Sequence, residues 1–263
     1  MERYIPEKFH AVDVHTHINL LLGKNYTSFN RSETDAILAE GDLLGIEKFC
    51  ISLPFMEKSI APESFRRAND IVFEAMEYSP RYTGFCFVDP GYMKDSCDEI
   101  LRCVRDGNMA GVKLYHQFRI DDPVLEPMLK LCGQLNCPVL MHAVKGEKPA
   151  TLSNAEHFVT AARRFPEVKF LQAHIGGGGD WEWNLRVLEN SPANLYIDTG
   201  GSVIDTGMIR RTVEVMGSSR VLFATDMFMA EGVGKLLAAG LDEMTMKKIL
   251  HDNAENILAG RLR

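Results

Sequence analysis

Residues 138–174 have the sequence PVLMHAVKGEKPATLSNAEHFVTAARRFPEVKFLQAH, which combines two kinds of periodicity. Two β-rich runs, PVLMHAV (138–144) and VKFLQAHIG (168–176), flank the stretch AEHFVTAARRFP (155–166). The apolar residues of that stretch recur at intervals of three and four, as in a helix packed on a sheet. A strand, a helix and a second strand in this order predict a βαβ unit with parallel strands.

The same alternation extends over the whole chain. The other β-rich runs are AVDVHTH (11–17), KFCISLP (48–54), RYTGFCFVDP (81–90), MAGVKLY (109–115), LYIDTGG (195–201) and RVLFATDM (220–227). Eight βα units in 263 residues predict a single (β/α)8 barrel domain over residues 1–263, since such barrels typically need about 250 residues. An open doubly wound sheet is the alternative, but no GxGxxG follows the first run.

The amino-acid composition of the chain makes nucleic acids and membranes poor candidates as partners. The chain has 36 acidic and 29 basic residues, a formal net charge of −7, and no basic stripe that would suit a nucleic-acid backbone or an anionic membrane. It has no apolar stretch near the ~18 residues of a membrane span. The start, MERYIPEKFH, lacks the features of a signal peptide, so we expect a cytoplasmic protein. The six cysteines form no CxxC, and we expect buried free thiols.

Polar residues at the carboxyl ends of the runs predict a metal site. His15 and His17 lie two residues apart on the first run, so both side chains point the same way, together with Asp13. His142, His174 and Asp226 end the fifth, sixth and eighth runs. Each alone is explained by a core histidine or a helix-capping aspartate, but in a barrel all of these ends meet at one mouth. Clustered imidazoles there suit a divalent metal such as Zn²⁺.

These residues and several longer segments resemble a known family. The pattern of HxH on the first strand, His on the fifth and sixth, and Asp on the eighth is that of the amidohydrolase superfamily. The finer resemblance is to the amidohydrolase-related group of metal-dependent hydrolases, which includes aminocarboxymuconate-semialdehyde decarboxylase-like enzymes. It covers nearly the whole chain and is most specific in RFPEVKFLQAHIGG (164–177) followed by FATD (223–226).

The resemblance implies roles for individual residues. His15, His17, His142 and Asp226 correspond to metal ligands, with Asp226 also a catalytic acid or base and His174 a catalytic residue off the metal. Lys113 is the third catalytic candidate. The resemblance implies one Zn²⁺ per chain, or two if Lys113 is carboxylated and bridges them. The alternatives for Lys113 are a free ammonium that binds a substrate carboxylate, and a structural lysine held by Asp13 or another carboxylate.

Other positions are less specific. Many relatives have a histidine where this chain has Tyr115, and His116 follows as a displaced contact or a loop residue. The loop GGGGD (176–180) predicts either close backbone approach to a ligand or a flexible turn, and Trp181 and Trp183 after it pack within the chain or on another subunit. Asp198 and Thr199 are expected to support the site by hydrogen bonds.

The main functional hypothesis is a metal-dependent hydrolase that uses a metal-activated water on an amide, ester or lactone bond of a small molecule. The alternative is a non-oxidative decarboxylase. Such enzymes usually bind the carboxylate through arginine, and no arginine ends a predicted strand, although Arg31 and Arg119 lie in loops. A TatD-like nuclease and an idle metal-binding barrel are further alternatives. We expect a small-molecule substrate and a homo-oligomer, specifically a dimer, without nucleic-acid or membrane partners.

Overall fold

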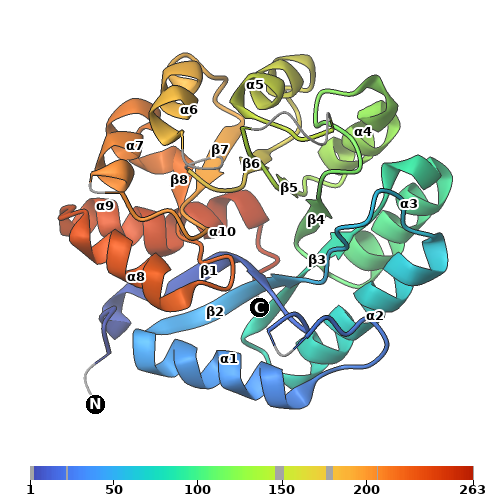
Figure 1. Ribbon diagram of the computed structural model, residues 1–263, viewed down its shortest axis with the longest axis horizontal. Helices are drawn as coiled ribbons and strands as arrows, with labels where there is room; N and C mark the ends of the chain where they lie inside the picture. Colours follow the sequence, from blue (N-terminus) through green and yellow to red (C-terminus); the bar gives the residue numbers. More distant parts are fainter. Residues whose placement is uncertain (1–2, 22, 146–150, 176–179, 206, 263) are drawn as a thin grey trace.

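The computed structural model describes residues 3–21, 23–145, 151–175, 180–205 and 207–262. Eight parallel strands follow one another around a single sheet in chain order (Figure 1). The ring closes where Val14 N–H donates to the Phe223 carbonyl at 3.0 Å and Asp226 N–H donates to the His15 carbonyl at 2.8 Å. The predicted (β/α)8 barrel is confirmed. The strands are β1 (Ala11–His17), β2 (Ile46–Ser52), β3 (Tyr82–Phe87), β4 (Gly111–Leu114), β5 (Val139–Met141), β6 (Phe170–Gln172), β7 (Leu195–Asp198) and β8 (Val221–Leu222).

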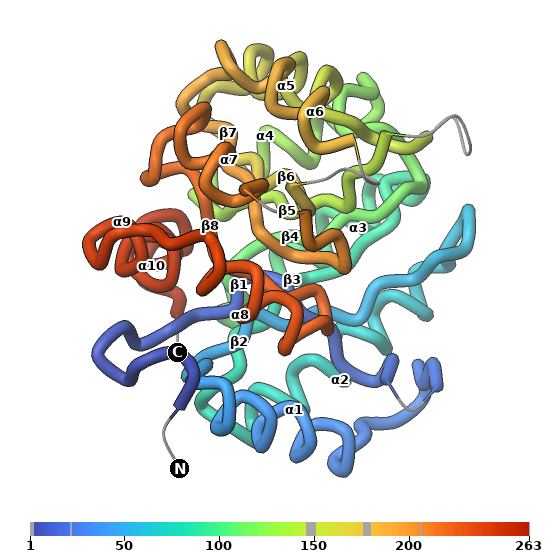
Figure 2. The backbone as a smooth tube through the Cα atoms, turned by 60° about the vertical axis from the view of Figure 1, so that its left-hand side comes forward, coloured from blue at the N-terminus to red at the C-terminus, as the bar shows by residue number. Residues whose placement is uncertain are grey.

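Helices surround the strand ring (Figures 1 and 2). The α-helices are α1 (Arg31–Leu44), α2 (Pro62–Tyr78), α3 (Met93–Ile100), α4 (Glu126–Gln134), α5 (Ala155–Arg164), α6 (Trp181–Leu188), α7 (Met208–Met216), α8 (Met229–Ala238), α9 (Glu243–Lys247) and α10 (Asn253–Leu258). The 3-10 segments are η1 (Glu7–Phe9), η2 (Pro90–Tyr92), η4 (Pro123–Leu125) and η5 (Ser218–Arg220), and the π-helical segments are η3 (Leu101–Asp106) and η6 (Lys248–Asp252).

Local sequence explains where individual helices begin and end. Helix α5 starts with a capping box, in which the side chains of Asn154 and His157 each accept a hydrogen bond from the other's backbone N–H. His157 is therefore a helix cap. Helix α1 begins at the side-chain cap of Asn30 and ends at Gly45, whose φ of 89° is a left-handed conformation that favours glycine.

The apolar side chains form two clusters. The larger one contains strand and helix residues, as expected between the ring and its outer helices. The smaller one joins residues in or directly beside seven strands with α10, as expected inside a barrel. Its members on α10 are Ala254, Ile257 and Leu258, which belong to the same cluster as Val12 and Leu222. One end of the barrel is thus filled by apolar packing, and the polar groups gather at the carboxyl ends of the strands.

The later strands are shorter than the sequence predicted. His142, His174 and Asp226 were expected to end strands, but β5, β6 and β8 stop at Met141, Gln172 and Leu222. His174 and Asp226 have φ values of 68° and 52°, and a left-handed residue cannot continue a strand. These side chains therefore stand on the segments just beyond the strands, still at the same edge of the barrel.

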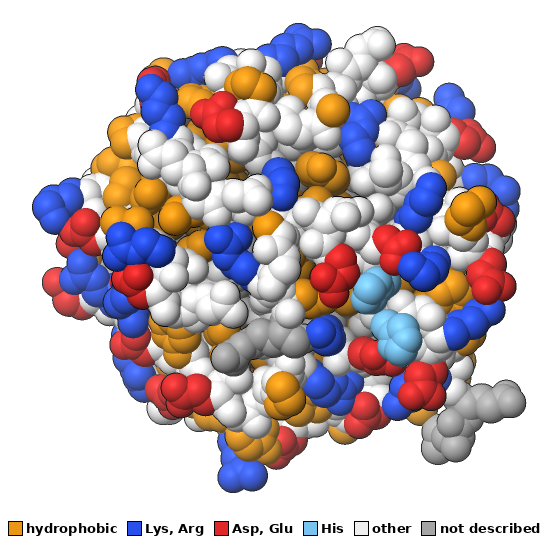
Figure 3. All heavy atoms as spheres, turned by 180° about the vertical axis from the view of Figure 1, so that it is seen from behind, with side chains coloured by type: hydrophobic (Ala, Val, Ile, Leu, Met, Phe, Trp, Pro, Cys, Tyr) orange, Lys and Arg blue, Asp and Glu red, His pale blue; other side chains and the backbone are white. Residues whose placement is uncertain are grey.

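The cysteines and the surface charges do not point to a particular function. All six cysteines are free, and all except the partly exposed Cys97 are buried. On the face drawn in Figure 3, acidic and basic side chains are interspersed with apolar ones. Within the described ranges, every helix is too short or too polar to cross a bilayer.

Candidate metal centre

Three side chains from opposite ends of the chain place ligand atoms around one point. The Nε2 atoms of His15 and His17 lie 3.4 and 3.2 Å from Oδ1 of Asp226. All three atoms fall within 4.8 Å of one another, and the two imidazole rings are 5.1 Å apart. The ring closure between β1 and the segment after β8 makes these residues neighbours.

Hydrogen bonds on the far side of each ring orient the two histidines. Nδ1 of His15 lies 2.9 Å from Oδ2 of Asp198, and Nδ1 of His17 lies 3.0 Å from Oγ of Ser52. A partner on Nδ1 fixes the ring, so that Nε2 faces the centre, as in many metal sites. The supporting role predicted for Asp198 agrees with this contact, whereas Ser52 was missed because nothing in its sequence context distinguishes it.

Asp226 is held by a turn that depends on Asp13. Oδ2 and Oδ1 of Asp13 accept hydrogen bonds from the hydroxyl and the N–H of Thr225, at 2.5 and 3.1 Å. Burial opposes ionisation of Asp226, but the nearby His15 and His17 hold the pKa of its carboxyl well below the usual range. Asp226 is therefore a carboxylate at neutral pH, the form that binds metals and accepts protons.

His142 and His174 form a second pair on the other side of Asp226. Nδ1 of His142 lies 3.1 Å from Nε2 of His174, which lies 3.6 Å from Oδ2 of Asp226. Burial, followed by the neighbouring His174 and Lys113, lowers the pKa of His142 to about 2, so its ring is neutral. Tyr115 stacks on His142 with the rings 4.5 Å apart and 18° from parallel. The residue that replaces the expected histidine thus braces the site.

Lys113 lies at the floor of the site without exposure to solvent. Its Nζ is 2.6 Å from Nε2 of His15, rather than on Asp13, whose carboxylate is occupied by Thr225. Burial lowers the pKa of Lys113 to about 8, although Asp226 and Asp198 favour its charge. The lysine is thus a buried cation close to its titration point, within reach of the same centre as the metal-type donors.

The donor set fits a divalent cation. Burial lowers the pKa values of His15 and His17, which favours their neutral, metal-binding form, and Asp226 supplies a carboxylate. Two imidazole nitrogens and one carboxylate oxygen suit Zn²⁺, Mn²⁺ or Fe²⁺. Nε2 of His15 lies beside the ammonium of Lys113, so the lone pair on Nε2 already points at a positive charge.

Two cavities adjoin these donors. The larger has a volume of about 320 Å³ and contains the side chains of His15, His17 and Lys113, with Lys24 as its other cation. The smaller, about 200 Å³, is lined by His174 and the segment Gly200–Val203. Both share His142, Asp226 and Phe228, and among their described lining residues none is an arginine. The apolar walls of the larger cavity are Leu20, Leu21, Pro54, Met56, Met227 and Phe228.

The family model described as Amidohydrolase matches residues 12–259. The chain belongs to the amidohydrolase family. The match includes all eight strands except Ala11 at the start of β1, so the resemblance seen in the sequence is confirmed. Among curated proteins, no sequence matches this amidohydrolase.

Solved structures share the fold at low sequence identity. The 2,6-dihydroxybenzoate decarboxylase from Rhizobium has 20% identity and a TM-score of 0.75, covering 95% of this chain and 98% of that one. The dihydroxybenzoic acid decarboxylase from Polaromonas sp. JS666, with bound manganese and 2-nitroresorcinol, has 18% identity and a TM-score of 0.74, over 95% and 96% of the two chains. The 4-oxalomesaconate hydratase from Rhodopseudomonas palustris has 17% identity and a TM-score of 0.70, over 96% of each chain.

Some positions singled out in the sequence lie outside the centre. Arg31 bonds to the Tyr78 hydroxyl and Arg119 to Asp121, and neither lines a cavity beside the donors. His116 contacts Tyr115 edge-on. Residues 176–179 of the glycine loop lie outside the described residues, so the two interpretations of that loop stay predictions. No sequence pattern indicated Lys24, Met56 or Phe228 as lining residues, because loops bring these side chains to the larger cavity.

The buried lysine predicts a pH-dependent stability. In metal-free protein, the folded state loses the Lys113 proton near pH 8, whereas the unfolded chain keeps it until about pH 10.5. Since the unfolded state then binds more protons, the free energy of unfolding should rise over this window. Relative to Lys113→Met, the wild type should gain up to about 3 kcal/mol as the pH increases.

Chemical denaturation in the presence of chelator, repeated across this pH range, measures the gain. Lys130→Met, which changes an exposed lysine on α4, is the matched control. A constant difference between wild type and Lys113→Met at all pH values would contradict the account of Lys113.

Proposed function

We propose that the protein is a metal-dependent decarboxylase, which releases CO₂ from a small hydroxylated aromatic acid. The observation that carries the proposal is the cavity of about 320 Å³, where apolar walls stand over a floor of metal-type donors and the buried Lys113. Such a cavity suits a flat apolar body with acidic oxygens at one end. The shared fold with two aromatic-acid decarboxylases supports the same choice over the hydrolase that the sequence first favoured.

In this proposal His15, His17, His142 and Asp226 hold one divalent cation. When bound, it holds substrate oxygens and offsets their negative charge. The bound manganese of the Polaromonas enzyme makes Mn²⁺ as suitable a candidate as the Zn²⁺ expected from sequence. The lone pair of His15 and the carboxylate of Asp226 face the same point, with His17 in the same group of donors, which supports these three residues as ligands. The place of His142 in the set rests on the family resemblance, since its Nδ1 faces His174.

The chain's own residues then have distinct tasks. Lys113 pairs with an acidic oxygen of the substrate at the floor of the cavity. Asp226, ionised at rest, accepts the proton of the substrate hydroxyl and delivers it to the ring carbon that bears the carboxyl group. The bond from that carbon to the carboxyl carbon breaks, its electron pair returns to the ring, and CO₂ leaves. His174, 3.6 Å from Asp226, orients that carboxylate.

Hydrolysis of an amide, ester or lactone remains the second candidate because of the lysine. The described lining residues of the two cavities include Lys24 and Lys113 but no arginine to bind a carboxylate in a fork. The same Asp226 carboxylate is suited to accept a proton from an attacking water. The metal ligands are the same for both reactions, so only the products separate them.

Metal content separates ligands from catalytic residues. His15→Ala and His142→Ala should each lose the ion, since each removes a proposed ligand, whereas His174→Ala should retain about one ion per chain. Elemental analysis after dialysis into metal-replete and then metal-free buffer measures this. His10→Ala, an exposed histidine, is the control. Loss of the ion from His174→Ala would make His174 a ligand, and two ions per chain in wild type would indicate a carboxylated Lys113.

The reaction type is tested by a paired screen of metal-loaded enzyme. Hydroxylated benzoic acids are assayed for CO₂ release, in parallel with lactones, esters and amides assayed for hydrolysis. We expect CO₂ release that falls by at least about 100-fold in Asp226→Asn, in line with the loss of a general acid–base group. Hydrolysis without CO₂ release would instead support the second candidate.

A further inference from the structure

The larger cavity has a cation at each end. Lys113 and His15 are buried and form its floor, whereas Lys24, Met56 and Phe228 are exposed and form its mouth. The walls of this cavity are apolar. The proposed reaction uses the groups at the floor and gives no task to the ammonium of Lys24.

The loop that carries Lys24 is held in place by its own contacts. The buried side chain of Asn19 donates to the Asn25 carbonyl at 3.0 Å, and the Asn25 N–H donates to the Asn19 carbonyl at 2.9 Å. The ring of Tyr26 stacks on Phe55 in the loop after β2, with the centroids 4.0 Å apart and the planes at 14°. The residues directly after Lys24 are therefore fixed, so a ligand that binds its ammonium has mainly the side chain to order.

The ammonium of Lys24 makes no ion pair within the described part of the chain. Its contact there is with Sδ of Met56 at 3.3 Å, and a thioether sulfur is a weak acceptor. Asp226 is the only carboxylate among the described lining residues of the larger cavity, and it lies beside His15 and His17. The N–H groups of Lys24 are thus available to an anion that enters the cavity.

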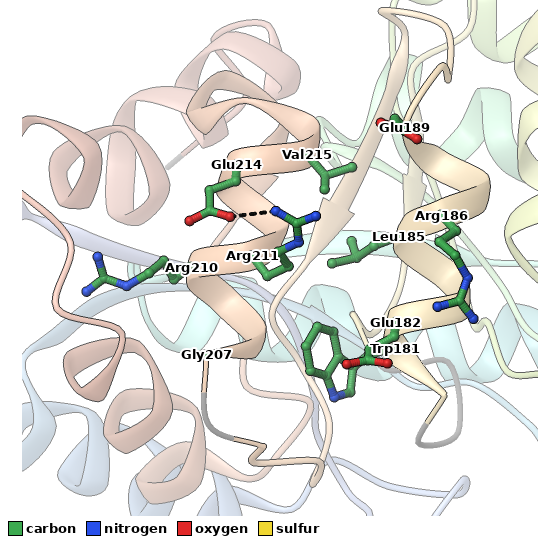
Figure 4. A pocket seen from close by; sticks show the side chains of 10 residues that line it. All are labelled: Trp181, Glu182, Leu185, Arg186, Glu189, Gly207, Arg210, Arg211, Glu214 and Val215. Atoms are coloured by element: carbon green, nitrogen blue, oxygen red, sulfur yellow. Dashed lines mark hydrogen bonds and ion pairs between the residues drawn. The ribbon is translucent and has the colours of Figure 1, made fainter.

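The groove between α6 and α7, on the outside of the barrel, differs in this respect (Figure 4). Its volume is about 550 Å³, and its described charged lining residues are three acidic and three basic. Arg211 pairs with Glu214 at 2.8 Å, and the indole N–H of Trp181 donates to Asp205 at 2.8 Å. The charges of this groove are balanced within it, in contrast to the charge of Lys24.

We propose that the substrate is a dianion, an aromatic acid with a second carboxylate that Lys24 binds at the mouth of the cavity. The reacting end then lies on the floor beside Lys113, and the ring packs on the apolar walls. With Lys113 protonated, the two lysines outweigh Asp226 among the described lining residues, although the whole chain is net −7. A cleft of one sign with apolar walls concentrates ligands of the opposite sign. The position of the reacting end rests on the proposed function, whereas the contact at Lys24 does not.

Binding of matched probes tests the mouth of the cavity without turnover. Benzene-1,3-dicarboxylate and benzene-1,4-dicarboxylate are each compared with their monoamides, which have nearly the same size and one negative charge less. The metal-loaded protein should bind at least one diacid about sixfold more tightly than its monoamide, of which a factor of about two is statistical, because the diacid has two equivalent ends. Isothermal titration calorimetry at neutral pH measures both dissociation constants.

Substitution of Lys24 should remove this preference. In Lys24→Met the ratio of the two dissociation constants should fall to about two, while the monoamide binds within about twofold of its wild-type affinity because the floor is intact. Lys24→Arg keeps the charge and should keep the ratio. Lys58→Met, which changes an exposed lysine that lines neither cavity, is the matched control. An increase in salt from about 20 mM to about 500 mM should lower the wild-type ratio, since the contact is exposed.

The outcomes for Lys24 and for the reaction are separate. The same ratio in wild type and in Lys24→Met, a wild-type ratio of only about two for both isomers, or no binding of either diacid would overturn the role of Lys24. Release of CO₂ from monoacids with any of these results would support the decarboxylase and contradict the dianionic substrate. The expected ratios without CO₂ release from any acid would support the contact at Lys24 and contradict the decarboxylase.

Discussion

The buried carboxylate of Asp198 ties the metal-type centre to the barrel. One oxygen accepts from Nδ1 of His15, and the other accepts from the backbone N–H groups of His174 and Gly200, at 2.9 Å in each case. Burial would raise the pKa of Asp198, but the adjacent His15 and these hydrogen bonds lower it to about 2. A single ionised group therefore fixes residues from β1, the segment after β6 and the segment after β7. Without it, Nδ1 of His15 would lose the hydrogen bond that orients the ring.

Asp13 performs the matching task on the other side. It binds Thr225, and Asp226 N–H binds the His15 carbonyl, so barrel closure and placement of the metal-type donors are the same event. This coupling explains why residues more than 200 positions apart meet with little freedom. Strands β5, β6 and β8 are short. His174 and Asp226, which follow β6 and β8 with a left-handed backbone, both line the smaller cavity. Pre-organised donors of this kind cost little reorganisation when a cation binds.

The sequence predicted the architecture because its periodic signals are local. The first strand, Ala11–His17, agrees with the predicted run, and the alternation of βα units was sufficient to indicate a barrel. The ends of β5, β6 and β8 were placed too late. After β6 and β8 the left-handed residues His174 and Asp226 interrupt a β-rich pattern without changing its composition. The cavity walls could not be predicted, since Met56 and Phe228 reach the centre through the path of their loops.

The position of a bound cation shows whether His15, His17 and Asp226 form the metal centre. Crystals grown with Mn²⁺ and measured on both sides of its absorption edge locate the ion by its anomalous scattering. We expect one strong peak per chain, between Nε2 of His15, Nε2 of His17 and the Asp226 carboxylate. The described residues contain another buried group of possible donors at Cys86, Glu99 and Cys103, where Arg102 already neutralises Glu99. A peak there with none beside Asp226, or no ordered ion at all, would contradict the account.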